Sequence, residues 1–165
     1  MKNIMIVAFS LLSSYADSQE KNDAEQVVTN LFVATDLKDW DRVESCFSST
    51  VQLDYSSLNG SPAVKLTPQE ITSSWKSILP GFTYTHHQLG NLISSVKGKN
   101  ANVFCYGTAS HYLEDQKGNI WTVVGSYDFE LISEDGAWKI TSMIFHFKYQ
   151  DGNTSLAQRA MQILK

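Results

Sequence analysis

The sequence has 165 residues, of which 42% are hydrophobic, and it carries a formal net charge of −4. This length supports one well-buried core and is too short for two comfortable domains, so we expect a single domain. The charged side chains are scattered without blocks, which argues against partners such as nucleic acid or an anionic membrane surface and favours small-molecule chemistry or protein contact.

The first sixteen residues have the pattern of a signal peptide. Lys2 supplies a positive start, Ile4–Leu12 form an apolar run, and residues 14–16 (SYA) resemble a small-x-small cleavage signal. The apolar run is too short to span a bilayer, and a buried N-terminal helix is the alternative. We expect cleavage after Ala16, export to a periplasm or to the medium, and no membrane anchor.

Helices and one short strand are predicted in the first half of the remaining chain. Apolar residues at helical spacing predict a first helix over Asp23–Thr35, and Asp39 is the expected N-cap of a short second helix. Alternation predicts a strand over Val51–Tyr55, followed by a loop over Ser56–Leu66 that contains an Asn-Gly pair and a proline. A third helix is predicted over Pro68–Ile78.

The second half of the chain is rich in predicted strands. Four long strands are separated by turn sequences, and they are expected over Tyr84–Val96, Asn102–Glu114, Ile120–Ser133 and Trp138–Tyr149. Helices followed by a strand meander are typical of an α+β domain with a curved, mixed or antiparallel sheet wrapped around N-terminal helices. We expect this domain to cover residues 17–154, followed by a tail at 155–165 with helical spacing.

Parity along the strands predicts which side chains face inward, because residues two apart share a face. On the second long strand one face is mostly small and leaves room for a ligand, and on the third the face with the large aromatic residues is expected inside. The buried stripe of the first helix adds one further aromatic ring. The candidate ligand contacts are Phe32, Cys105, His111, Trp121 and Tyr127.

The cysteines and histidines give no sign of a disulfide framework or a metal site. Cys46 and Cys105 lie on a predicted helix and a predicted central strand, so we expect two buried free thiols, with a single disulfide as the alternative. No pair among the four histidines has helical ligand spacing. We therefore expect no metal, and no cofactor-binding motif is found.

Three residues are candidates for acid–base chemistry. Asp36 follows the buried stripe of the first helix, and the alternative is that it only caps or ends that helix. For Tyr55 the alternative is a tyrosine buried in the core. His86 and His87 are adjacent on a strand, so only one of them points inward. A histidine held by a carboxylate in a dry pocket is an effective base. A nearby phenol can donate a hydrogen bond to a substrate carbonyl oxygen that gains negative charge. Such groups suit proton abstraction followed by loss of a leaving group.

Successive segments resemble motifs of the SnoaL-like superfamily, especially scytalone dehydratase and more loosely hexachlorocyclohexane dehydrochlorinase. They are residues 35–43 (TDLKDWDRV), 51–55 (VQLDY) and 85–91 (THHQLGN), and the closing 135–140 (DGAWKI) and 151–153 (DGN) are also similar. The resemblance covers about residues 25–153 and implies a cone-shaped domain.

The resemblance also implies roles for the candidate residues. His87 matches the general base of the family, Asp36 its orienting partner, and Tyr55 a tyrosine that positions water against a substrate carbonyl. His111 lies on the strand that carries a second pocket histidine in the dehydratase, about one strand repeat away. A family tyrosine is replaced by Thr35, and a serine and an asparagine appear as Gly125 and Tyr127. Scytalone itself is therefore not the expected substrate.

Two functions are consistent with these residues. The first is an exported, cofactor-independent lyase or isomerase, dehydratase-like, that acts on a small cyclic or aromatic compound. The second is a non-catalytic ligand-binding protein or an oligomeric scaffold with a degenerate pocket, and a cavity below about 300 Å³ would favour the scaffold. Outward aromatic residues such as Tyr106 and Phe147 predict a homo-oligomer, either a dimer or a trimer.

Overall fold

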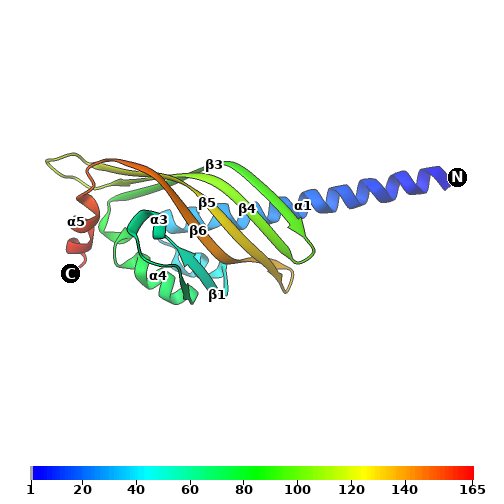
Figure 1. The fold of residues 1–165 in the computed structure, drawn as a ribbon, viewed down its shortest axis with the longest axis horizontal. Coiled ribbons are helices and arrows are strands. Elements are labelled where there is room, and N and C mark those ends of the chain that lie inside the picture. Colours follow the sequence, from blue (N-terminus) through cyan, green and yellow to red (C-terminus); the bar gives the residue numbers. More distant parts are fainter. Residues whose placement is uncertain (1) are drawn as a thin grey trace.

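The computed structural model of the protein describes the backbone of residues 2–165 and the side chains from Ser18 onward. Figure 1 shows helices collected on one side of a long curved sheet. In chain order the elements are α1 (Lys2–Leu37), α2 (Trp40–Ser45), β1 (Phe47–Asp54), α3 (Ser56–Asn59), β2 (Val64–Leu66), α4 (Pro68–Lys76), the 3₁₀ turn η1 (Leu79–Gly81), β3 (Tyr84–Lys97), β4 (Asn100–Tyr112), β5 (Ile120–Glu134), β6 (Ala137–Gly152) and α5 (Leu156–Ile163).

The sheet has six strands in the order β2-β1-β6-β5-β4-β3. Strands β3 to β6 form an antiparallel meander, β1 pairs with β6 in parallel, and β2 pairs with β1 in antiparallel orientation. The sheet curves around the C-terminal half of α1 (Figure 1). This arrangement confirms the predicted α+β class and the mixed, curved sheet wrapped around N-terminal helices.

Helix α1 is longer than the helix predicted over residues 23–35. Its C-terminal turn positions Asp36. Lys38 adopts a left-handed conformation with φ of 58°, and its N–H donates to the Thr35 carbonyl at 3.1 Å. The Asp39 N–H donates to the Ala34 carbonyl at 2.9 Å, which completes a Schellman-type end. The helix carbonyls are thus satisfied by backbone groups, and the Asp36 carboxylate in the last turn is not needed to end the helix.

The predicted signal peptide over residues 1–16 stays a prediction. Met1 lies outside the described backbone, and the side chains of residues 1–17 lie outside the described side chains. Within the part of the chain that the structure describes, no helix combines the length and the apolar content required to cross a bilayer.

Side chains cap the starts of α2 and α4, and the N-cap predicted at Asp39 is confirmed. The Asp39 carboxylate accepts from the Arg42 N–H at the start of α2, and Thr67 forms a reciprocal capping box with Glu70 at the start of α4. Helix α4 ends at Lys76 rather than at the predicted Ile78, because the chain then tightens into the proline-containing turn η1.

The prediction of a single loop over Ser56–Leu66 was wrong. This segment contains helix α3 and strand β2. Gly60 ends α3 with φ of 73°, a conformation that glycine adopts without strain. Strand β2 then returns along β1, with Leu66 opposite Val51, and adds an edge strand that is too short and too exposed to produce a sequence signal.

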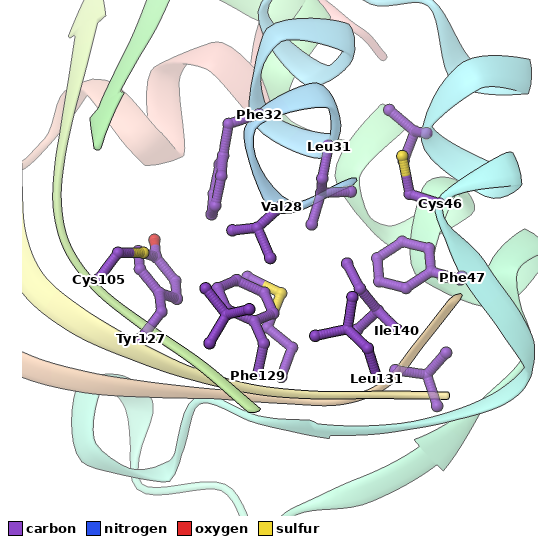
Figure 2. Packing of buried hydrophobic residues seen from close by; sticks show 14 of the residues in the cluster. Val28, Leu31, Phe32, Cys46, Phe47, Cys105, Tyr127, Phe129, Leu131 and Ile140 are labelled. Atoms are coloured by element: carbon purple, nitrogen blue, oxygen red, sulfur yellow. The ribbon is translucent and has the colours of Figure 1, made fainter. Parts of the chain in front are cut away.

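One large hydrophobic core fills the space between α1 and the concave face of the sheet. Figure 2 shows Val28, Leu31 and Phe32 of α1 facing Phe129 and Leu131 of β5 across this core. Its fully buried residues come from both helices and strands, so the core fixes α1 against the sheet and thereby positions the last turn of the helix.

The two cysteines are free and buried, which confirms the predicted free thiols. Cys46 and Cys105 lie on opposite sides of the core cluster in Figure 2. Burial raises the pKa of the Cys46 thiol to about 11 and that of Cys105 to about 12. Both therefore stay protonated near neutral pH and are poor nucleophiles.

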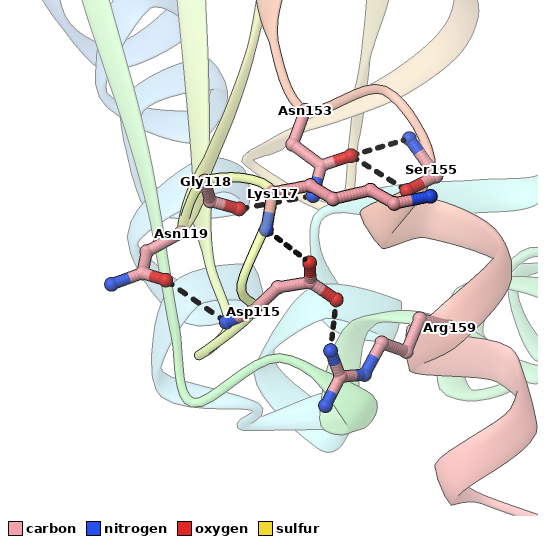
Figure 3. A network of polar contacts seen from close by, with 7 residues as sticks. All are labelled: Asp115, Lys117, Gly118, Asn119, Asn153, Ser155 and Arg159. Carbon is pink, nitrogen blue, oxygen red and sulfur yellow. Dashed lines mark hydrogen bonds and ion pairs between the residues drawn. The ribbon is translucent and has the colours of Figure 1, made fainter.

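The C-terminal tail is helical and packs on the domain. Leu156 and Ala160 of α5 are fully buried in a second cluster with Phe82 and Leu113. Figure 3 shows polar contacts that tie α5 and the segment before it to the β4–β5 loop, including an ion pair between Arg159 and Asp115. The tail is thus part of the folded unit rather than an appendage to it.

Candidate active site

Asp36 and His87 form a directly bonded pair at the end of α1. The His87 ring nitrogen Nδ1 lies 2.7 Å from Oδ1 of Asp36, and the His87 backbone N–H donates to Oδ2 at 2.7 Å. Both carboxylate oxygens are therefore bound to one residue. Since a carboxylate at a helix C-terminus is disfavoured by the helix dipole, the position of Asp36 is explained by His87 and not by helix capping.

The electrostatics of the pair favour an ionised carboxylate. Burial by itself raises the pKa of Asp36, but hydrogen bonds from the ring and backbone of His87, the charge of that ring and a smaller contribution from Thr85 outweigh it, so the pKa lies below the ordinary value. An ionised Asp36 accepts the Nδ1 proton when His87 is neutral. The lone pair of the imidazole is then on Nε2, which is the atom that can act as a base.

Strand parity places His87 inward and His86 outward. The His87 side chain is 13% exposed, whereas His86 is solvent-exposed. His87 lies opposite the small residue Ala109 on β4 and stacks against Phe32 of α1, with ring centroids 5.3 Å apart. Nε2 of His87 has no hydrogen-bond partner among the described residues, so this nitrogen is free to meet a ligand.

His111 is a second histidine in the same site. Its ring centroid lies 5.9 Å from that of His87, and it stacks on Trp121 at 4.6 Å. Burial, together with the neighbouring His87, lowers the pKa of His111 to about 4. His111 is therefore neutral at pH 7, and because its Nδ1 lies 3.3 Å from the carbonyl oxygen of Trp121, that nitrogen carries the proton and Nε2 is an acceptor.

Tyr55 lies just after strand β1 rather than within it. Its carbonyl receives the backbone N–H groups of Leu58 and Asn59, so Tyr55 begins helix α3, and its ring packs against Phe145 with centroids 5.9 Å apart. Burial raises the pKa of the Tyr55 phenol, which keeps it protonated and able to donate a hydrogen bond.

These groups share a cavity of about 280 Å³. His87, His111, Tyr55 and Tyr127 supply its titratable groups. The remaining lining is largely aromatic and aliphatic and comprises Phe32, Thr35, Leu58, Asn59, Ser74, Trp75, Ile78, Leu79, Ala109, Trp121, Val123 and Phe145. The exposed residues in this set lie on α3 and α4, so the opening of the cavity is between these two helices.

Helix α3 is fastened to the sheet by one hydroxyl group. Ser57 Oγ donates to the Phe145 carbonyl at 2.5 Å and accepts from the Phe147 N–H at 2.9 Å. The hydroxyl thus continues the pairing of β6 beyond the point where β1 ends, at Asp54 opposite Ile144. This anchor positions the α3 side of the cavity mouth.

Most of the predicted site residues meet in this cavity. His87, Tyr55 and four of the predicted ligand contacts line it, and those four are Phe32, His111, Trp121 and Tyr127. Asp36 lies behind His87. Cys105 does not line the cavity, because it is fully buried in the core, so its position does not support the predicted contact with a ligand.

The residues at the mouth were missed from sequence. Leu58 and Asn59 belong to α3, which was predicted as loop, and Trp75 and Ile78 lie on or just beyond α4. The third helix was predicted over Pro68–Ile78, but nothing in its sequence indicated that Trp75 and Ile78 line a cavity. Nothing in a short polar segment such as 56–59 signals that it covers a cavity formed by distant strands.

No metal site is found in the described part of the chain. No group of three or more His, Cys, Asp or Glu side chains there could hold a metal ion. His146 is instead paired with Asp128, with Nε2 2.7 Å from Oδ2 on the exposed face of the sheet.

A curved sheet around a helix, with a carboxylate–histidine pair beside a cavity, defines a cone-shaped α+β domain. The sequence profile of the SnoaL-like domain matches residues 16–144, which is more than half of the chain. The chain belongs to the SnoaL-like domain family. A search of curated protein sequences gave no match.

Solved structures of the same fold support this assignment. A protein from Kribbella flavida is 21% identical and superposes with a TM-score of 0.79, covering 86% of this chain and 99% of its own. A protein from Novosphingobium aromaticivorans proposed to be a scytalone dehydratase is 16% identical, with a TM-score of 0.70 and coverage of 85% and 91%. A hexachlorocyclohexane dehydrochlorinase from Novosphingobium barchaimii is also 16% identical, with a TM-score of 0.66 and coverage of 89% and 94%. At these identities the likeness establishes the fold.

Proposed function

We propose that this protein is a cofactor-independent lyase or isomerase that acts on a small cyclic or aromatic compound by acid–base chemistry. The observation that carries the proposal is the Asp36–His87 pair, with Nδ1 of His87 2.7 Å from the carboxylate and its other nitrogen unpartnered beside an aromatic cavity. A base oriented by a carboxylate at one side and open to a dry pocket at the other is suited to removing a proton from carbon.

In this proposal each residue of the site has one role. Nε2 of His87 takes a proton next to an activating group of the substrate, and Asp36 stabilises the imidazolium that forms. Tyr55 donates a hydrogen bond to the substrate oxygen or to a water molecule, where negative charge develops. In an elimination, the imidazolium then returns its proton to the departing group, so that a hydroxyl group leaves as water and His87 is neutral again.

The structural relatives support the reaction class without identifying the substrate. One relative is a hexachlorocyclohexane dehydrochlorinase and another is proposed to be a scytalone dehydratase, and both names describe elimination reactions. The cavity here has mostly apolar walls. Since cavities of about 150 Å³ already bind benzene, a volume of about 280 Å³ suits a single substituted ring.

The alternative is a non-catalytic protein that binds a ligand or serves as an oligomeric scaffold, and the size of the cavity favours the scaffold. Its volume of about 280 Å³ lies just below the lower end of typical ligand pockets, about 300 Å³. The positions at which the dehydratase carries further polar groups are Thr35, Gly125 and Tyr127 here. A ligand in this cavity would therefore have few polar contacts besides the histidines and tyrosines.

Turnover of a panel of cyclic ketones and hydroxylated or halogenated ring compounds separates the two functions. The test compares wild type with His87→Ala and with the matched control His86→Ala, which alters the neighbouring exposed histidine. The proposal predicts turnover by wild type and His86→Ala and a loss of about 10²-fold or more in His87→Ala. Binding of ring compounds by all three proteins without any turnover would refute catalysis and support a binding function.

A further inference from the structure

Two glycines face each other in the sheet beneath the cavity. Gly107 of β4 pairs with Gly125 of β5. A Cβ atom at Gly107 would lie 2.4 Å from Cε2 of Tyr127, and one at Gly125 would lie 2.4 Å from Cε2 and Cζ of Phe145. Non-bonded carbon atoms do not approach this closely, so any larger residue would displace the rings. The two glycines create the space in which Tyr127 and Phe145 lie against the sheet.

The Tyr127 ring is tightly held. Its centroid lies 5.1 Å from that of Phe32, 5.7 Å from Phe129 and 4.7 Å from Phe145. Figure 2 shows the Tyr127 ring beside Phe129, with Phe32 above it. Contacts of this kind leave the ring little freedom to move, so the direction of its hydroxyl group is fixed by the core.

The Tyr127 hydroxyl group has no hydrogen-bond partner among the described residues, although the residue as a whole is only 6% exposed. Tyr127 lines the cavity, and its hydroxyl oxygen is not completely enclosed by protein. Polar groups in protein interiors are normally paired. A ligand atom in the cavity is the natural partner for this hydroxyl.

We propose that Tyr127 is a specificity-determining residue whose hydroxyl donates a hydrogen bond to an oxygen atom of the ligand. Gly107 is the positioning residue that gives the ring its place. The ligand class is a small ring compound that carries a carbonyl or another acceptor oxygen directed at the sheet. The inference deepens the proposed function and rests on it in placing the substrate in this cavity.

Binding of a matched pair of probes tests the inference. Cyclohexanone and methylenecyclohexane have nearly the same shape. The first carries an acceptor oxygen where the second carries a methylene group. NMR titrations give the ratio of the two affinities for wild type and for each variant. Tyr127→Phe keeps the ring and removes the donor, so it is expected to lower the ketone affinity about tenfold and leave the hydrocarbon affinity unchanged. Tyr106→Phe, a change on the exposed face, is the control.

One result would overturn this inference. It is a folded Tyr127→Phe protein whose ratio of ketone affinity to hydrocarbon affinity equals that of wild type. The measurement does not depend on turnover. A protein that never turns over a substrate but loses its ketone preference in Tyr127→Phe would refute the proposed function and leave this inference standing.

A second variant tests the role of Gly107. Gly107→Ala is expected to push the Tyr127 ring from its place and weaken binding of both probes at least about fivefold. Gly90→Ala is the matched control, because a Cβ atom at Gly90 meets nothing within 4 Å. Thermal unfolding establishes that each variant is folded. Unchanged probe binding in folded Gly107→Ala would contradict the positioning role.

Discussion

At the scale of residues, the site depends on one carboxylate with a depressed pKa. Asp36 accepts two hydrogen bonds from His87, and these outweigh the effect of burial on its pKa. The residue types and the order of Asp36, Tyr55 and His87 could be read from the sequence because of their resemblance to a family. Their distances could not, since they depend on how the core fixes α1 against β3.

Asp36→Asn is expected to lower the free energy of unfolding by about 2 kcal/mol at pH 7, the usual size for a hydrogen bond to a charged group. A carboxyl group with a depressed pKa stabilises the fold above its unfolded pKa, about 3.9, and that stabilisation is lost as the pH falls through the folded pKa. The difference between wild type and Asp36→Asn should therefore shrink below about pH 4. Urea unfolding at pH 7 and pH 3 measures it, with exposed Asp41→Asn as control, and a pH-independent difference would contradict the assignment.

The lowered pKa of His111 should make the free energy of unfolding depend on pH in a second range. Its folded pKa of about 4 is below that of an unfolded histidine, about 6.5, so the unfolded chain binds a proton more readily between these values. Wild type should lose on the order of 3 kcal/mol of stability from this group as the pH falls from 6.5 to 4. His111→Gln should show a flatter profile in urea unfolding. Equal slopes for wild type and variant would show that His111 titrates normally.

At the scale of elements, the wall of the cavity depends on short segments that pattern analysis does not resolve. The long strands were predicted to within a few residues because their alternation is strong. Helix α3 was missed because it has only four residues and no apolar period. Helix α5 was predicted from its spacing, but its contact with Phe82, whose ring lies 4.9 Å from His111, depends on tertiary packing.

Ser57→Ala tests the role of α3 at the cavity mouth. The variant removes both hydrogen bonds that fasten α3 to β6, so Leu58 and Asn59 should lose their fixed positions. We expect about a threefold to tenfold weaker affinity for cyclohexanone, since one or two hydrogen bonds are lost, with a faster dissociation rate. Ser61→Ala, an exposed change just beyond α3, should have no effect. An affinity equal to that of wild type would show that α3 does not shape the site.

At the scale of the whole molecule, the fold class followed from the order of helices and strands, and the family from local motifs. Export and self-association remain proposals. Tyr106 is 44% exposed on the outer face of the sheet, whereas Phe147 is half-buried and packs against the core. Only the first of these two residues is therefore available for the predicted homo-oligomer contact, which light scattering of the purified protein would test.

The proposed leader gives a prediction at this scale. The buried core begins at Ala24, so removal of residues 1–16 leaves every described core contact in place. N-terminal sequencing of protein recovered from an exporting host should start at Asp17. Its free energy of unfolding should be within about 0.5 kcal/mol of the uncleaved form, as for changes away from the core. An intact N-terminus in the exported or cellular protein would contradict the leader.

The central claim is that His87 is held by Asp36 through Nδ1 and presents Nε2 to a ligand cavity. Nitrogen-15 NMR of the four histidine rings tests it most directly, at a pH where the rings are neutral. We predict the proton of His87 on Nδ1, in contrast to His146, whose Nε2 faces Asp128. Addition of cyclohexanone should shift Nε2 of His87 and leave His86 unchanged. A proton on Nε2 of His87, or a His87 ring that does not respond to the ketone, would contradict the account.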